Sequence, residues 1–150
     1  MTADLAQLRA QARYLLDRRA ILDCIYRYCR GLDRLDAETL AASFHPDAQD
    51  VHGGWVGYAP DLVSWGIELV AKSIMSSHHI TGHRCEIDGD VAHAESYILS
   101  YGRRADGGVT SFCGRYLDRF EKTDGTWRFA RRKIVAVSLG DMTAHVIGAT

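Results

Sequence analysis

The chain has 150 residues, 47% of them hydrophobic and 25% charged, which is the size and composition of one globular domain with a sizeable core. Its 18 basic and 19 acidic residues give a formal net charge of −1, too little positive charge to neutralise phosphates, so nucleic acid is excluded as an expected partner. No apolar run approaches the roughly 20 residues that cross a bilayer, and the first residues lack the layout of a secretion signal. We therefore expect a single cytoplasmic domain over residues 1–150 with no membrane partner.

The first third of the chain is predicted to be helical. Apolar residues recur there at spacings of three and four with Arg and Asp between them, the pattern of an amphipathic helix. They are Leu5, Leu8, Ala12, Leu15, Ala20, Ile21, Ile25, Tyr28 and Leu32. Asp36 can cap a second short helix over residues 37–43, which His45-Pro46 ends. The two helices should form a hairpin.

The rest of the chain is predicted to be mostly strands. Residues 48–52 and 55–57 flank a Gly53-Gly54 turn and predict a short hairpin, and residues 61–72 have a helical pattern that suits a lid or wall. Four longer strands follow at residues 78–87, 91–103, 109–121 and 127–139, separated by Gly and Asp turns. Helices followed by an antiparallel meander predict an α+β fold in which a curved sheet wraps around the N-terminal helices.

Four segments carry more specific residues: Arg19 to Asp33, Phe44 to Ala48, His78 to Asp90, and Gly125 to Arg132. In this order they resemble the SnoaL-like branch of the NTF2-like superfamily, whose fold is a cone-shaped α+β barrel. That branch includes scytalone dehydratase, a hexachlorocyclohexane dehydrochlorinase and a bile-acid dehydratase, which are cofactor-free lyases built on an Asp-His pair. The resemblance covers the chain from about residue 18 to about residue 139.

The resemblance implies four catalytic residues. Asp33 matches the family Asp and His78 the family His. Arg132 matches the arginine that the dehydrochlorinase uses on its leaving group, and Tyr28 matches a tyrosine of the bile-acid enzyme. This chain also has His79, and strand alternation puts adjacent histidines on opposite faces. We favour His78 because it keeps the spacing of four residues to the position where related sequences usually carry Asn.

These residues suit elimination of water or halide next to an acidic C–H. Such a reaction needs a base on the carbon, help for the leaving group and a dry pocket. A neutral His78 can act as the base, and Asp33 on its other nitrogen would fix the tautomer and stabilise the imidazolium. Arg132 and a tyrosine hydroxyl, from Tyr28 or Tyr58, can stabilise negative charge on a departing or enolate oxygen.

Each candidate also has a structural interpretation. Asp33 can be a helix cap, His78 a satisfied strand histidine and Tyr28 a core residue, while Arg132 lies in a basic run typical of a solvated strand face. Tyr28 and Asp33 also point about 140° apart on a regular helix, because each residue turns about 100°. We therefore expect the helix to bend or end near Gly31.

The sequence predicts neither a metal nor a cofactor. The cysteines Cys24, Cys29, Cys85 and Cys113 lack zinc-type spacing and are expected to be reduced and mostly buried. His45 and His52, with Asp47 and Asp50, show no spacing typical of a metal site. His83 is expected to share a strand face with His79.

The leading functional hypothesis is a cofactor-independent lyase or isomerase acting on a small, apolar, cyclic molecule. Related folds also host ketosteroid isomerases and polyketide cyclases, and the fold alone does not choose between these chemistries. The pocket is predicted to be lined by Trp55, Tyr58, Trp65, Met75, Tyr97, Ile98 and Phe112. The alternative is a non-catalytic binding or assembly subunit, like the small subunit of ring-hydroxylating dioxygenases. Apolar residues on both faces of the later strands also predict a homodimer or homotrimer.

Overall fold

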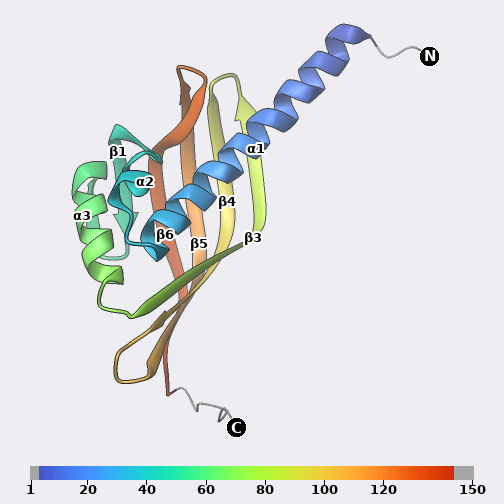
Figure 1. The fold of residues 1–150 in the computed structure, drawn as a ribbon. Coiled ribbons are helices and arrows are strands. Elements are labelled where there is room, and N and C mark those ends of the chain that lie inside the picture. The colour runs from blue at the N-terminus through green and yellow to red at the C-terminus, as the bar shows by residue number, and fades with distance from the viewer. Residues whose placement is uncertain (1–3, 144–150) are drawn as a thin grey trace.

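The computed structural model describes residues 4–143, which form three helices and six strands (Figure 1). In chain order they are α1 (Leu5–Asp33), α2 (Ala37–Ala41), β1 (Phe44–His52), β2 (Trp55–Tyr58), α3 (Ala59–Val70), β3 (Met75–Asp88), β4 (Val91–Arg103), β5 (Gly108–Thr123) and β6 (Thr126–Thr143). The predicted order of helices and strands is confirmed, with boundaries that differ by a few residues. The two largest differences are at β1, which already begins at Phe44 and includes His45-Pro46, and at β6, which continues to Thr143.

All six strands belong to one sheet in the order β2-β1-β6-β5-β4-β3. Neighbouring strands are antiparallel except β1 and β6, which pair in parallel, Asp50 opposite Arg132. The sheet curves around the C-terminal half of α1 (Figure 1). Helix α3 lies beside the edge of the sheet that β1 and β2 form. This is the open, curved α+β sheet of an NTF2-like cone, as predicted. None of the helices within residues 4–143 is long and apolar enough to cross a membrane.

The buried core lies between the second half of α1 and the concave face of the sheet. On the helix it begins at Ile21 and Ile25, both fully buried, and Phe120 and Phe129 of the sheet pack opposite with no exposed surface. The first half of α1 extends past the sheet in Figure 1, so its apolar residues, such as Leu5, are exposed. Cys24, Cys29 and Cys85 are buried and Cys113 is partly buried, and all four are free thiols. The expectation that the cysteines are mostly buried is therefore confirmed.

Of the bend or end expected near Gly31, the structure shows an end, at Asp33. The helix stays regular through Gly31 and ends at Asp33, where the backbone turns through Leu35, whose φ is 53°. Gly31 is needed for another reason, since a Cβ atom there would lie 2.8 Å from backbone and side-chain atoms of Leu40. The glycine lets α2 pack directly on α1.

We predict that Gly31→Ala destabilises the protein by about 1–3 kcal/mol, because the clash with Leu40 outweighs the gain in helix propensity. Denaturant unfolding of the variant measures this loss. Gly66→Ala in α3 is the matched control, because the added Cβ would meet only side-chain ends, Cδ2 of Leu32 at 3.2 Å and Cδ2 of Leu40 at 4.0 Å. Equal stabilities of the two variants would contradict the prediction.

A bulge in β3 changes which side chains face the cone interior. The pairing of β3 with β4 shifts register between Thr81 and Arg84, and Gly82 adopts a positive φ of 54°. A bulge inserts one extra residue and so reverses the alternation beyond it. His83 therefore lies on the inner face, where its Nδ1 is 2.9 Å from Oγ of the fully buried Ser96. The prediction that His83 shares a face with His79 is wrong.

Candidate active site

Asp33, the last residue of α1, and His78 in β3 form a hydrogen-bonded pair. Nδ1 of His78 lies 2.5 Å from Oδ1 of Asp33. The other carboxylate oxygen, Oδ2, accepts a hydrogen bond of 2.9 Å from the backbone N–H of His78, and the Ser76 hydroxyl donates to Oδ1 at 3.0 Å. Three contacts therefore hold the carboxylate against the imidazole.

Both side chains of the pair are largely buried, with 12% of His78 and 18% of Asp33 exposed. Burial acts to raise the pKa of Asp33, but the hydrogen bonds and charge of His78 outweigh it and hold this pKa below its usual value. Asp33 is thus ionised at neutral pH and favours a proton on Nδ1 of His78. Nε2 of His78 remains as the nitrogen that can accept a proton from a bound molecule.

His79 lies on the opposite face of β3. Its Nε2 is 2.9 Å from the hydroxyl of Ser77 at the exposed surface, and its ring packs edge-on to Tyr101. The structure therefore pairs Asp33 with His78 and not with His79, which is the arrangement that the spacing favoured.

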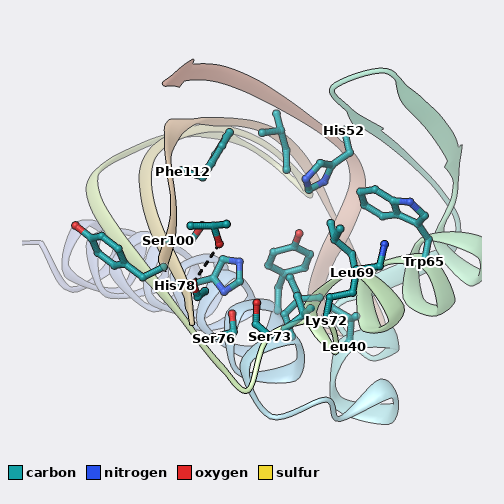
Figure 2. A pocket seen from close by; sticks show the side chains of 18 of the residues that line it. Leu40, His52, Trp65, Leu69, Lys72, Ser73, Ser76, His78, Ser100 and Phe112 are labelled. Atoms are coloured by element: carbon teal, nitrogen blue, oxygen red, sulfur yellow. Dashed lines mark hydrogen bonds between the residues drawn. The ribbon is translucent and has the colours of Figure 1, made fainter. Parts of the chain in front are cut away.

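His78 lines a cavity of about 510 Å³ inside the cone, and Asp33 lies behind it, outside the cavity wall (Figure 2). A cavity of this volume suits a small organic molecule. Most of its wall is apolar. The apolar side chains come from the three helices and from β5 and β6, and include Leu32, Leu40, Leu62, Trp65, Leu69, Phe112, Tyr116 and Ile134. Polar side chains also line the cavity, namely His52, Lys72, Ser73, Ser76, His78, Ser100, Arg104 and Thr110. The cavity therefore offers a mostly apolar space with hydrogen-bonding groups at these positions.

Two of the aromatic residues predicted to bind substrate, Trp65 and Phe112, line this cavity. Trp55 does not; it stacks on Trp65 with ring centroids 5.2 Å apart and supports that ring. Ile98 is buried in the core of the sheet and is likewise not part of the cavity wall.

The other three predicted substrate-binding residues lie outside the cavity and are corrected here. Tyr97 is 49% exposed, because strand alternation turns it outward while its neighbour Ile98 faces the core. Tyr58 and Met75 are 57% and 53% exposed, since each stands at the end of a strand with its side chain on the surface. Aromatic and sulfur-containing side chains alone did not reveal which face of each strand they occupy.

Arg132 is fully buried, so the interpretation as a solvated strand face is wrong. Its Nε and Nη2 donate to the two carboxylate oxygens of Asp118 at 2.8 and 2.7 Å. The rings of Tyr28, Tyr116 and Phe129 surround the guanidinium, with centroids 3.9–4.1 Å from Cζ. The ion pair with Asp118 holds the pKa of Arg132 well above its usual value.

Arg132 lies behind the cavity wall rather than in it, whereas Tyr28 reaches the cavity. One face of the Tyr28 ring covers the guanidinium of Arg132, and burial raises the pKa of its hydroxyl. Tyr28 is therefore both a core residue and part of the cavity wall, although α1 does not bend. Arg132 can influence a bound molecule through its charge but not through direct contact.

The SnoaL-like domain family matches residues 13–133, most of the chain. The chain belongs to this family. Among curated proteins no match was found. Among solved structures, a Mycobacterium tuberculosis protein of unknown function is 29% identical, with a TM-score of 0.75 over 83% of this chain and 74% of that one.

Two further structures share the SnoaL-like fold at lower identity. A protein from Novosphingobium aromaticivorans, named as a candidate scytalone dehydratase, is 24% identical with a TM-score of 0.80 over 93% of this chain and 99% of that one. A hexachlorocyclohexane dehydrochlorinase from Novosphingobium barchaimii is 22% identical with a TM-score of 0.79 over 93% and 99% of the two chains. These likenesses support the fold that the SnoaL-like assignment implies.

This SnoaL-like chain has a second acid-histidine pair that sequence reasoning considered only as metal ligands. Asp50 and His52 both project inward from β1, with Oδ1 of Asp50 3.9 Å from Nδ1 of His52. Both oxygens of Asp50 and Nδ1 of His52 are buried without a hydrogen-bond partner within the described residues. Residues 4–143 contain no group of three or more His, Cys, Asp or Glu side chains placed to hold a metal. The sequence did contain a signal for this pair: Asp50 and His52 are two positions apart in a predicted strand, so their side chains share one face of it.

Burial raises the pKa of Asp50 to about 7, an effect that Arg132 opposes and Asp118 reinforces. Burial also lowers the pKa of His52 to about 4, and the charges of Arg132 and His78 add to this. At neutral pH His52 is therefore neutral, and a large fraction of Asp50 is protonated. This SnoaL-like site thus places an uncharged imidazole beside a carboxyl that can hold a proton.

The raised pKa of Asp50 predicts a pH-dependent stability difference between the wild type and Asp50→Asn. Between about pH 4 and pH 7 the folded state holds a proton on Asp50 that the unfolded state has lost, so the wild type loses stability as pH rises. The asparagine variant lacks this loss, and its relative stability should rise by about 1 kcal/mol per pH unit and level off above pH 7. The lowered pKa of His52 makes stability rise with pH, but this contribution cancels in the difference because both the wild type and the variant contain His52. Urea unfolding from pH 4 to pH 8 measures the difference, and a pH-independent difference would contradict the prediction.

Proposed function

We propose that the protein is a cofactor-independent lyase or isomerase that removes a proton from a small, apolar, ring-containing molecule. The observation that supports this most is the Asp33–His78 pair, held by a 2.5 Å hydrogen bond, whose imidazole lines a mostly apolar cavity. In such surroundings the carboxylate stabilises the imidazolium that forms when Nε2 takes a proton from carbon. No metal or cofactor is needed for this step.

The reaction class follows from what the cavity offers beyond the base. Elimination of water or halide needs a leaving group beside the acidic C–H, whereas isomerisation needs the proton to return at another carbon. The names of related structures, a candidate scytalone dehydratase and a dehydrochlorinase, favour elimination. We therefore place dehydration or dehydrohalogenation ahead of isomerisation or cyclisation.

The test is a turnover screen of hydroxylated and halogenated ring compounds, among them steroids, polyketides and cyclohexane derivatives, followed by mass spectrometry. We expect loss of water or hydrogen halide from at least one class with the wild type. His78→Ala should abolish the product and His79→Ala should retain it. Product formation that survives His78→Ala would overturn the proposed function.

A second candidate is a non-catalytic assembly subunit, favoured by apolar side chains on the outer face of the sheet. Leu99 is 38% exposed there, two residues along β4 from the outward-facing Tyr97, which is 49% exposed. A homodimer or homotrimer would cover these residues. Sedimentation of the wild type and of Leu99→Asp tests this candidate. An oligomeric wild type that the substitution dissociates, together with no turnover in the screen, supports the assembly subunit, whereas unchanged assembly of the variant contradicts it.

A further inference from the structure

The cavity has a second polar wall opposite the proton-transfer pair. His52 ends β1 and faces the cavity, while His78 faces the same space from β3 (Figure 2). The ring of His52 is held by edge-on packing against Trp65, with centroids 4.9 Å apart. Its orientation is therefore fixed by an aromatic neighbour that is itself stacked on Trp55.

The two nitrogens of His52 have different surroundings. Nδ1 is buried without a hydrogen-bond partner in the described chain and lies 3.9 Å from Oδ1 of Asp50. Nε2 is the nitrogen left to meet a molecule in the cavity. Asp50 in turn is 1% exposed, has no hydrogen-bond partner in that part of the chain and lies opposite Arg132 in the β1–β6 register. Buried polar groups without partners are costly, so their retention points to a role.

We propose that His52 binds the hydroxyl of the substrate and protonates it as it departs, with Asp50 as the positioning residue that holds the replacement proton. This inference rests on the proposed lyase function and narrows it to dehydration of a hydroxylated ring compound. A halide needs no proton to leave, whereas a hydroxyl does. The substrate would carry its hydroxyl on the carbon next to the acidic C–H, so that one carbon faces each wall.

The proton and electron transfers balance. Nε2 of His78 takes the proton from carbon, the C–H electrons form the double bond, and the C–O bond breaks with its electrons on oxygen. That oxygen takes the proton from Nε2 of His52, while the carboxyl of Asp50, after closing the 3.9 Å separation to hydrogen-bond distance, gives its proton to Nδ1. The products are an alkene and water, with an imidazolium at His78 beside Asp33 and a carboxylate at Asp50 beside the Arg132 cation. Proton exchange with water resets both pairs.

Arg132 suits this scheme without touching the substrate. Its Nη1 has no hydrogen-bond partner among the described residues, while its other nitrogens are taken by Asp118. A cation on the strand beside Asp50 favours the carboxylate that forms when Asp50 gives up its proton. Burial raises the pKa of that carboxyl to about 7, so a large fraction of it still holds a proton to donate at neutral pH. Burial thus favours the protonated carboxyl of Asp50 before the reaction, and the charge of Arg132 stabilises its carboxylate afterwards.

The test uses 2-naphthol and naphthalene, two rings of equal size of which one carries a hydroxyl. Neither can undergo elimination, so binding is measured independently of turnover by NMR titration of the full chain. The wild type should bind 2-naphthol about tenfold more tightly than naphthalene, and His52→Phe should abolish this preference, since one hydrogen bond is lost and the aromatic packing on Trp65 is kept. His79→Phe, the same substitution at a histidine on the outer face of β3, should retain the preference.

A tautomer measurement tests the role of Asp50 separately. At pH 6 the ¹⁵N shifts of His52 should show a proton on Nε2 in the wild type, and Asp50→Leu should return them to the tautomer mixture of free imidazole. Unchanged shifts would overturn the positioning role, and an unchanged preference for 2-naphthol in His52→Phe would overturn the inference. A failed turnover screen with an intact naphthol preference would sink the lyase function but leave His52 as the hydroxyl-binding residue.

Discussion

Replacing Asp33 by asparagine is expected to lower kcat by about 10³–10⁴-fold with little change in KM, on whichever substrate the screen identifies. The asparagine keeps the shape of the side chain and can keep the hydrogen bond from the backbone N–H of His78. It carries no charge to stabilise an imidazolium, and its amide can hold the ring in the wrong tautomer. Steady-state kinetics with a circular dichroism check of the fold measure the effect.

Two matched variants control for the position of the change. Ser77→Ala and His79→Ala alter the residues that flank His78 but face the outer surface, where they bond to each other. Both should keep wild-type kcat within about twofold, as expected for surface substitutions away from the site. If Asp33→Asn keeps wild-type kcat while His78→Ala loses it, the carboxylate is a structural cap and not part of the chemistry.

The second large effect is expected from Asp118→Asn, which should destabilise the protein by about 3–5 kcal/mol. The substitution breaks a bidentate ion pair whose partners are both completely buried and leaves the guanidinium of Arg132 without a counter-charge. The three aromatic rings around Arg132 compensate only part of this loss. Urea unfolding at pH 7 measures the change.

An exposed ion pair provides the control for Asp118→Asn. Arg19 and Asp23 form a pair on α1 at 2.9 Å, with 68% and 45% of the side chains exposed. Asp23→Asn should cost no more than about 0.5 kcal/mol, because such pairs are screened by water. The double variant Asp118→Leu with Arg132→Met should recover most of the stability lost in Asp118→Asn. A double variant as unstable as the single one would show that packing, and not the unpaired charge, causes the loss.

Local patterns in the sequence were sufficient to predict the helices and the long strands. The spacing from Ile21 to Leu32 specifies α1, and Asp36 caps α2 by accepting from the backbone N–H of Thr39. Gly turns separate the strands as expected. Each of these signals depends on residues within a few positions of one another, which sequence alone displays.

Features that depend on distant residues were not predictable in the same way. The parallel pairing of β1 with β6 joins segments about eighty residues apart, and it alone brings Asp50 beside Arg132. The bulge at Gly82 reverses the strand alternation and moves His83 inward. Side-chain direction on Tyr97 and Met75 likewise follows from register and strand ends. Family resemblance supplied Asp33 and His78, but it contained no signal for His52.

The most direct test of the account is hydrogen exchange into 1-tetralone, a bicyclic ketone with an acidic C–H, in D₂O. A base that faces the cavity should exchange that hydrogen whether or not a leaving group is present. We predict that the wild type and His79→Ala accelerate deuterium incorporation above the buffer rate, and that Asp33→Asn and His78→Ala do not. Exchange at the buffer rate by wild-type protein that is saturated with the ketone would contradict the claim that Asp33 and His78 remove protons from carbon.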